Sequence, residues 1–303
     1  MLTLQAMTQK TLSKSYKFWG KGLHSGCYSH MRIKPAPADT GVVFVRTDKN
    51  VTIPALAEFV SSTSRSTTIS CGRVSVGTIE HVLSALTGLG VDNAIIEIDN
   101  KEVPIIDGSA KYYMDRMAMD PLVDQGVERR WVEIDREYFI KDRKSGSYIK
   151  ITPAEEPSMD VTIDFNSRVL GVQKVHWDPS VDYVNEIGPC RTFCFFHEIQ
   201  HMASLGLVKG GDVENAIVIV EKPVCEKKLD RVAKAFGQPR LEVTPSGYLS
   251  NLELRFPDEC GRHKLLDLMG DMRLVGGFLK AHVEAYKPGH AINTKAAKSV
   301  NSK

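Results

Sequence analysis

Residues 259–275 read ECGRHKLLDLMGDMRLV, and no other segment constrains the fold as strongly. Apolar residues recur at helical spacing, at positions 265, 266, 268 and 269, so we predict a helix over the whole stretch. His263 and Asp267 are four residues apart, which places both side chains on one helix face, one turn apart. An imidazole and a carboxylate at this spacing suit Zn²⁺, although such a pair is also common on a solvated helix face.

Asp271 lies one further turn along the same face. It has two interpretations. The residues at 263, 267 and 271 could form the solvated face of an amphipathic helix. Alternatively, Asp271 could be the carboxylate that orients a histidine at a metal site.

A second signal is the pair Glu80-His81 within residues 78–89 (TIEHVLSALTGL), for which we predict a helix. In many zinc hydrolases a histidine binds the metal and a glutamate acts as base. Position 85 is alanine, so the HExxH pattern is absent and the other ligands must come from elsewhere. A histidine buried against a sheet is the structural alternative.

Two weaker patterns also contain histidines. Residues 289–293 read GHAIN, where His290 is predicted to lie on a glycine-flanked turn.

The other pattern consists of residue types that bind zinc, namely Cys190, Cys194, His197 and His201, but only two residues separate the cysteine pair from the histidine pair. A zinc finger needs a loop of roughly a dozen residues there, so we do not predict a metal site from these four.

The rest of the chain alternates between short strands and helices without regular βαβ spacing, which indicates an α+β fold. A polar segment at 120–130 is the predicted linker between two α+β domains, 1–125 and 126–303. Strands are expected at 27–34, 40–46, 93–98, 131–140, 148–152, 159–165, 216–220 and 283–286, and further helices at 109–119, at 193–205 and over the last 13 residues.

Composition excludes several classes of protein. The 303 residues carry a net charge of +2, which argues against nucleic acid as the main partner. Six scattered cysteines do not form a disulfide scaffold, and no apolar run approaches the roughly 18 residues of an integral membrane span. The N-terminus has no signal-peptide pattern, so we expect a cytoplasmic protein.

Four motifs follow one another along the chain, namely TIEH at 78–81, RTF at 191–193, HKLLDLMGD at 263–271 and GHAIN at 289–293. In this order the sequence resembles the UDP-3-O-acyl-N-acetylglucosamine deacetylases, the zinc amidases of lipid A biosynthesis. The resemblance runs from about residue 9 to the C-terminus. It implies two domains, each a β-sheet layered on helices, with the helical layers facing one another across the active site and a small insert in each domain.

The resemblance also implies one Zn²⁺ per chain, bound by His81, His263 and Asp267. Three protein ligands leave one position for water, which is typical of a catalytic zinc. Glu80 then matches the general base that takes the proton of the attacking water.

Four further residues have roles implied by the resemblance. Thr192 would hold the oxyanion, and a protonated His290 would give its proton to the amine that leaves. Asp271 would keep His290 charged, because a nearby carboxylate raises a histidine pKa. Lys264 would pair with an anionic group or a carbonyl of the substrate.

The implied substrate is a UDP-linked acylated glucosamine. The second insert, at about 193–220, would form an apolar passage for its acyl chain, although an ordinary buried core is the alternative for each wall residue. The sequence has Ser167 where many members of the family have histidine, and this departure concerns the contacts expected with the nucleotide. The expected substrate-binding residues are Leu23, Phe165, Thr192, Phe193, Ile199, Val208, Val218 and Lys264, with Leu207 and Ala216 as further walls.

Two alternatives to this function remain open. One is a zinc amidase acting on another acylated amino sugar, and the other is a catalytically inactive binding protein of the same fold. Some members are fused to a C-terminal hydroxyacyl-carrier-protein dehydratase. This chain has 13 residues after His290, so we expect any such dehydratase to be a separate partner or a fused domain outside this sequence.

Overall fold

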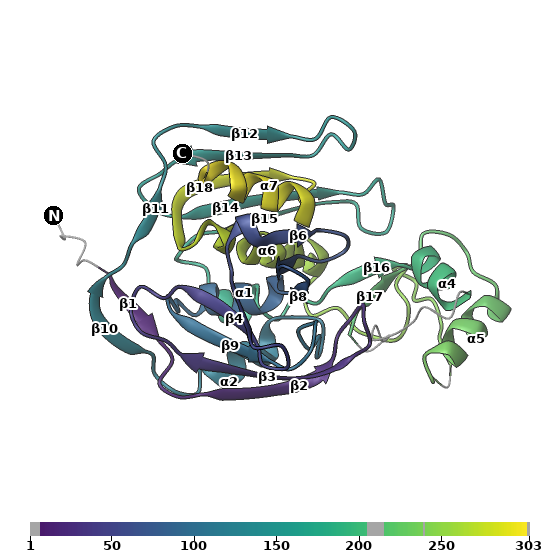
Figure 1. The fold of residues 1–303 in the computed structure, drawn as a ribbon. Helices are drawn as coiled ribbons and strands as arrows, with labels where there is room; N and C mark the ends of the chain where they lie inside the picture. Colours follow the sequence, from purple (N-terminus) through teal and green to yellow (C-terminus); the bar gives the residue numbers. More distant parts are fainter. Residues whose placement is uncertain (1–6, 205–214, 239, 302–303) are drawn as a thin grey trace.

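Two β-sheets enclose a pair of central helices in the computed structural model, which describes residues 7–204, 215–238 and 240–301 (Figure 1). The first sheet has five strands in the order β2-β3-β9-β4-β5, with β4 and β9 parallel and the other neighbours antiparallel. Its strands are β2 (Tyr16–Lys21), β3 (Tyr28–Pro35), β9 (Ala94–Ile98), β4 (Val42–Arg46) and β5 (Val51–Pro54).

The second sheet has six strands, with β18 at its centre between β13 and β14. Strand β18 alternates buried and half-buried residues along its nine positions, as expected when one face packs on a core. Its strands are β11 (Trp131–Glu133), β12 (Tyr138–Lys141), β13 (Tyr148–Pro153), β14 (Ser158–Asp164), β15 (Val172–Trp177) and β18 (Phe278–Tyr286).

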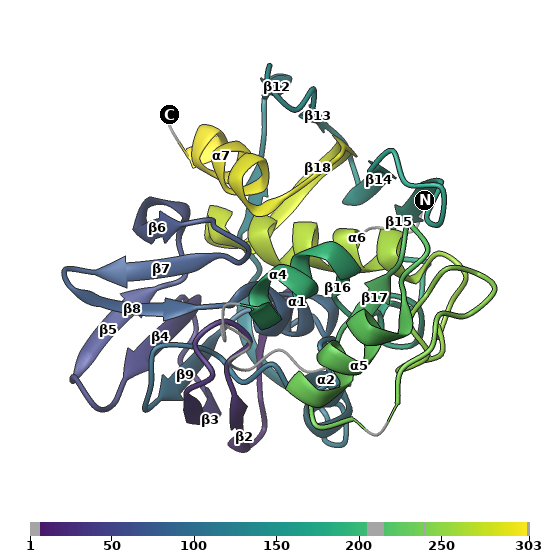
Figure 2. The ribbon, with the colours of Figure 1, turned by 90° about the vertical axis from the view of Figure 1, so that its right-hand side faces the viewer.

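Helices α1 (Glu80–Gly88) and α6 (Glu259–Met272) pack against each other between the sheets (Figure 2). They approach closely at Gly270, where an added Cβ atom would lie 2.1 Å from the carbonyl oxygen of Glu80. The hydroxyl of Ser84 also donates a hydrogen bond to the carbonyl of Leu266, at 2.6 Å. Both contacts fix the two helices relative to each other.

Other helices cover the two sheets. Helix α2 (Lys111–Met117) contacts β2 of the first sheet, and α7 (His290–Asn301) packs on β12, β13 and α6. Single-turn helices are η1 (Ala57–Phe59), α3 (Tyr183–Glu186) and η2 (Arg273–Val275). The predicted helix at 259–275 is therefore correct in extent, with a 3-10 turn at its end.

Two small units extend from these layers. The first is a three-stranded sheet of β6 (Val60–Ser62), β7 (Thr68–Cys71) and β8 (Val74–Gly77). The second comprises the parallel strands β16 (Phe193–Phe195) and β17 (Ile217–Ile219) with helices α4 (Phe196–Ser204) and α5 (Glu226–Ala235), and it projects from the body in Figure 1. The prediction of helix throughout 193–205 is wrong at its start, because Phe193–Phe195 pairs with Ile217–Ile219 as a strand.

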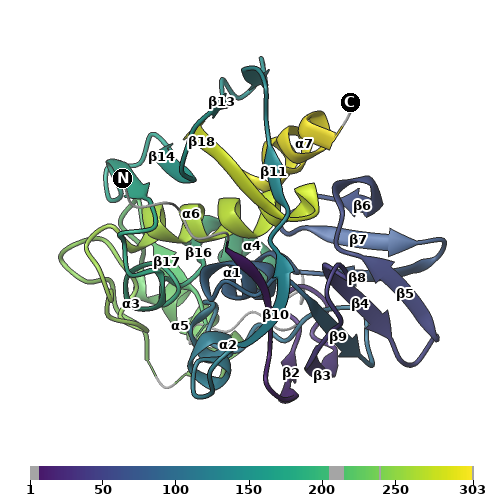
Figure 3. The same ribbon diagram turned by 90° about the vertical axis from the view of Figure 1, so that its left-hand side faces the viewer.

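The segment predicted as a polar linker contains a strand. Strand β10 (Val123–Glu128) pairs antiparallel with β1 (Thr8–Thr11), and it continues toward β11 along one side of the molecule (Figure 3). The predicted strand at 131–140 is likewise two strands, because β11 pairs parallel with β18 whereas β12 pairs antiparallel with β13.

The hydrophobic core divides into two clusters of buried side chains. The larger one fills the space between the sheets and the central helices, and the smaller one lies in the unit that contains α4 and α5. Among the described residues, none of the helices combines the length and the apolar composition needed to cross a lipid bilayer.

Candidate active site

The packing of α1 on α6 brings together three side chains that the sequence singled out. His81 lies near the start of α1, and His263 and Asp267 lie one turn apart on α6. Their ligand atoms all lie within 4.8 Å of one another. Asp267 Oδ1 is 3.6 Å from His81 Nε2 and 3.4 Å from His263 Nε2. All three residues are buried, so the interpretation of this helix face as solvated is wrong.

The chemistry of these three groups fits a metal ion. Asp267 Oδ1 is buried and has no hydrogen-bond partner within the described part of the chain, so a negatively charged acceptor is left without a donor. The Nδ1 atom of His263 lies 3.0 Å from the carbonyl oxygen of Cys190, which as an N–H donor leaves Nε2 free to bind a metal. Burial lowers the pKa of His263 to about 3, so its imidazole is neutral, as a metal ligand must be.

Glu80 is the first residue of α1 and is buried beside this cluster. Its Oε2 accepts a hydrogen bond from the backbone N–H of Thr67, at 3.0 Å. Burial raises the pKa of the Glu80 carboxyl, which makes the group a stronger base than an exposed glutamate.

His290 lies beside Glu80 and Asp267 at the cluster. Its Nε2 lies 3.9 Å from Glu80 Oε1, and its Nδ1 lies 2.9 Å from Asp271 Oδ2. Burial acts to lower the pKa of His290, but the carboxylates of Asp271 and Glu80 raise it to about 9. A charged His290 is thus available at neutral pH. The residue is the first of α7, which corrects the prediction that it lies on a turn.

Lys264 and two aromatic side chains lie at the edge of the cluster. The Lys264 ammonium is 2.8 Å from Asp267 Oδ2 and 5.5 Å from the centre of the Phe193 ring. Phe193 also contacts His263 edge to face, and Phe165 contacts Phe193 with ring centres 5.5 Å apart. Phe165 is 42% exposed, so its ring is accessible to a ligand. The structure therefore brings Lys264, Phe193 and Phe165 together.

Thr192 is held beside this group by backbone contacts. Its N–H donates to the carbonyl of Gly108, and its own carbonyl accepts from Ile217. The preceding residue, Arg191, forms a buried ion pair with Glu259 at the first turn of α6, at 2.9 Å. The Arg191–Glu259 pair ties the Thr192 segment to the helix that carries His263 and Asp267.

A buried carboxylate that the sequence patterns did not reveal organises the segment around Leu23. Glu102 accepts hydrogen bonds from the backbone N–H groups of His24 and Ser25 and from the hydroxyl of Thr78. Thr78 has a positive φ of 58°, which is uncommon for a β-branched residue and is often found near functional sites. Leu23 itself is half-buried.

Some of the residues predicted to line an acyl passage lie in the smaller hydrophobic cluster, and others lie outside the described residues. Ile199 and Val218 are buried in the smaller hydrophobic cluster, together with Leu229 and Val232 of α5. Val208 and Leu207 lie outside the described residues. That Ile199, Leu207, Val208 and Val218 line a passage for an acyl chain stays a prediction.

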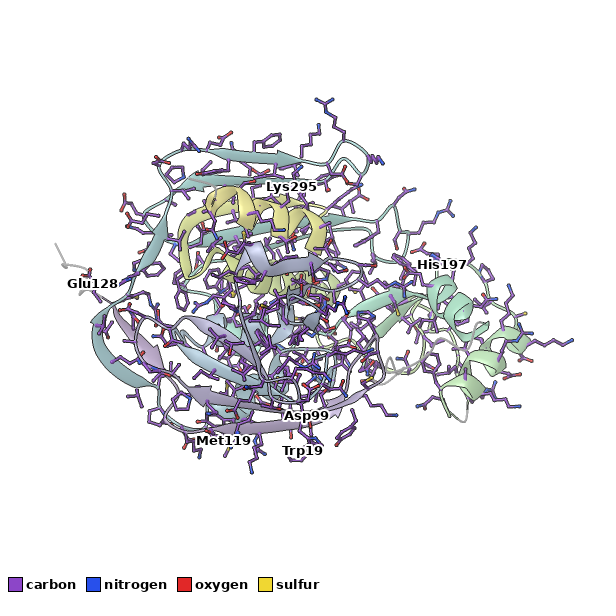
Figure 4. All side chains as sticks on the ribbon, in the orientation of Figure 1. Trp19, Asp99, Met119, Glu128, His197 and Lys295 are labelled. Carbon is purple, nitrogen blue, oxygen red and sulfur yellow. The ribbon has the colours of Figure 1, made fainter. Side chains whose placement is uncertain are left out.

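The six cysteines have no role in the metal cluster. All are free thiols, and within the described ranges the His81, His263 and Asp267 group is the one candidate metal cluster. His197 lies on α4, in the unit that projects from the body (Figure 4), and its ring stacks on that of Phe195. That this cysteine–histidine pattern does not bind zinc stays a prediction.

A buried triad of two histidines and one carboxylate, with a glutamate and a charged histidine beside it, defines a metal-dependent hydrolase site. The family model for UDP-3-O-acyl N-acetylglycosamine deacetylase matches residues 9–236 and 240–302. The chain belongs to this family.

Named relatives agree with the family match. A bifunctional enzyme LpxC/FabZ of Porphyromonas gingivalis is 39% identical over 294 residues, which cover 96% of this chain and 64% of that protein. UDP-3-O-acyl-N-acetylglucosamine deacetylases are 37% identical in a Nostoc species and 38% identical in Myxococcus xanthus. Those alignments cover 97% of this chain, and 98% and 86% of the respective relatives. The chain thus spans less than two thirds of the bifunctional relative.

Proposed function

We propose that this chain hydrolyses the N-acetyl group of UDP-3-O-acyl-N-acetylglucosamine, releasing acetate and the free 2-amine, in lipid A biosynthesis. The observation that carries the proposal is the buried triad of His81, His263 and Asp267, with the side chains of Glu80 and His290 beside it and 3.9 Å apart. Family membership supplies the substrate class.

One Zn²⁺ per chain would be held by His81, His263 and Asp267. When bound, the ion would lower the pKa of a water molecule and polarise the acetamide carbonyl. The donor set of two imidazoles and one carboxylate supports zinc, and the unpartnered Asp267 Oδ1 supports an ion at this position.

The proposed proton transfers use two residues of this chain. Glu80 takes a proton from the attacking water, since burial makes its carboxylate basic. His290 stabilises the developing negative charge and then gives its proton to the amine that leaves. Asp271 holds the His290 ring by its Nδ1 atom and keeps it charged.

The remaining roles concern binding. Thr192 would donate its hydroxyl to the oxyanion, and Lys264 would pair with an anionic or carbonyl oxygen of the substrate. Phe165 would contact the nucleotide, which its exposure and its ring contact with Phe193 support. The acyl chain and sugar would contact Leu23, Phe193, Ile199, Val208 and Val218.

Three further expectations, on domain division, cellular location and partner, belong with this proposal. We divide the chain into domains 1–125 and 126–303, with their helical layers facing each other through α1 and α6. We place the protein in the cytoplasm, in keeping with its family membership. A dehydratase, fused or separate, is the proposed partner, since relatives include bifunctional enzymes.

The test is to incubate the zinc-loaded chain with UDP-3-O-acyl-N-acetylglucosamine and follow both products by mass spectrometry. Free amine and acetate in equal amounts are expected. Comparison substrates with the acyl chain removed, or with UDP replaced by a simple phosphate, distinguish this function from an amidase for another amino sugar. Equal rates on all three substrates would contradict the proposal, as would the absence of product.

A further inference from the structure

Thr67 contacts Glu80, the proposed base, and Asp271, the carboxylate that holds the proposed acid His290. Its backbone N–H donates to Glu80 Oε2 at 3.0 Å, and its hydroxyl donates to Asp271 Oδ1 at 2.5 Å. We propose that Thr67 is a positioning residue that holds the base Glu80 and the Asp271–His290 pair in one fixed arrangement. The inference rests on the proposed function, because it assigns Thr67 to that reaction.

Thr67 is itself firmly held. It is fully buried and directly precedes β7 of the small three-stranded sheet. Its carbonyl accepts a hydrogen bond from the N–H of Ile79, the residue before Glu80, at 3.3 Å. Because the backbone of Thr67 contacts both Ile79 and Glu80, the small sheet is bound to the start of α1. The hydroxyl is the part of Thr67 that reaches across to α6.

The Asp271 carboxylate has hydrogen-bond donors on both of its oxygens. Oδ1 accepts from the Thr67 hydroxyl, while Oδ2 accepts from Asn293 Nδ2 at 2.9 Å and lies 2.9 Å from His290 Nδ1. Donors on opposite sides prevent the carboxylate from turning about its Cβ–Cγ bond. Loss of the Thr67 hydroxyl would leave Oδ1, in a fully buried residue, without that donor, and the carboxylate would be free to reorient away from His290.

A catalytic effect follows from this arrangement. Glu80 Oε1 and His290 Nε2 are 3.9 Å apart and must act on the same bound group, so small displacements of either one matter. Thr67 is fully buried behind Glu80 and Asp271, to which it is hydrogen-bonded. We therefore expect it to affect turnover rather than substrate binding. Loss of a group that orients a metal-binding side chain typically lowers activity by about 10- to 100-fold, and we expect a similar loss when the support of Asp271 and His290 is removed.

The substitution Thr67→Val tests this, because valine keeps the shape and removes only the hydroxyl. With the zinc-loaded protein we expect kcat to fall by about 10- to 100-fold with KM unchanged, and Thr67→Ser to restore most of the loss. Thr11→Val is the matched control. Thr11 lies on strand β1, outside the helices that carry the proposed catalytic residues, and its buried hydroxyl donates to the carbonyl of Asn93. We therefore expect kcat to be unaffected in Thr11→Val.

A second measurement does not depend on activity. The Nδ1 proton of His290, bonded to a carboxylate, should give a far-downfield proton NMR signal that is absent in His290→Gln. We expect this signal to shift or broaden in Thr67→Val but not in Thr67→Ser or Thr11→Val. If Thr67→Val does not fold, Thr67→Ser and Thr67→Ala are compared instead, because these two variants differ from each other only by the hydroxyl.

The two proposals fail in different ways. A wild-type chain that releases no acetate contradicts the proposed function, and the NMR signal then decides the role of Thr67 alone. An active wild type with unchanged kcat and an unchanged His290 signal in Thr67→Val overturns the positioning role. A raised KM with kcat unchanged would also contradict it.

Discussion

A methyl carbon added to Gly270 would lie 2.1 Å from the carbonyl oxygen of Glu80, and 2.8 Å from the carbon of that carbonyl. Real Cβ atoms do not approach backbone so closely, so the absence of a side chain at Gly270 sets the distance between α6 and α1. That distance places His81 next to His263 and Asp267.

We therefore predict that Gly270→Ala forces the two helices apart. It should lower the free energy of unfolding by about 1–3 kcal/mol, as for overpacking of a core, and weaken metal binding because the ligands separate. Urea unfolding and zinc titration measure the two effects. Gly261→Ala in the same helix is the control, since its added Cβ would meet the side chain of Gln173 rather than backbone. Equal behaviour of the two variants would contradict the prediction.

The pH dependence of kcat/KM should be bell-shaped. Glu80 must be ionised to accept a proton, so activity is lost as the pH falls through its raised pKa. His290 must be protonated to donate, so activity is lost as the pH rises through its pKa of about 9.

The substitution Asp271→Asn identifies the alkaline limb of this profile. It removes the carboxylate charge that raises the pKa of His290, so the alkaline limb should move to lower pH. Asp115→Asn, at an exposed pair with Lys111, should leave the profile unchanged. An alkaline limb that stays in place in Asp271→Asn would mean that another group is the acid.

Loss of the base should separate catalysis from metal binding. Glu80→Ala should retain zinc, because Glu80 is not one of the three proposed ligands, but should lose about 10²- to 10⁴-fold in kcat. Metal analysis and steady-state kinetics on the same preparation measure both. His263→Ala is the comparison, and it should lose the metal together with the activity. A Glu80→Ala protein without zinc would show that the base assignment is wrong.

The buried ion pair of Arg191 and Glu259 should be important for stability. Glu259→Gln leaves the buried guanidinium without its counter-charge, which typically costs about 3–5 kcal/mol in the free energy of unfolding. Glu242→Gln is the control, since its pair with Arg240 is exposed and should contribute at most about 1 kcal/mol. Urea unfolding measures both. A loss below about 1 kcal/mol for Glu259→Gln would contradict the structural role.

Local patterns indicated the two parts of the metal cluster separately, and the family resemblance joined them into one set of ligands. His263 and Asp267 have helical spacing, and His81 adjoins a glutamate, but no spacing rule links position 81 to positions 263 and 267. Thr67 and Glu102 were not visible, because they act through contacts to residues distant in the sequence. Thr67 reaches Asp271 across 204 positions, and no spacing rule links them.

The errors in secondary structure have a similar origin. Phe193–Phe195 directly precedes the helix α4, and its pairing with Ile217–Ile219 makes it a strand, which its aromatic residues also favour. Val123–Glu128 is polar and mostly exposed, yet it pairs with β1 because that strand lies alongside it. In both cases the strand pairs with a partner that is distant in the sequence.

Reversible removal of the metal tests the central claim most directly. The chain is freed of metal with a chelator, dialysed, and assayed for acetate release before and after one equivalent of Zn²⁺ is returned. We predict that the metal-free protein is inactive, that activity returns in proportion to zinc up to one ion per chain, and that Asp267→Ala does not recover. A metal-free protein that still releases acetate from the substrate would contradict the account.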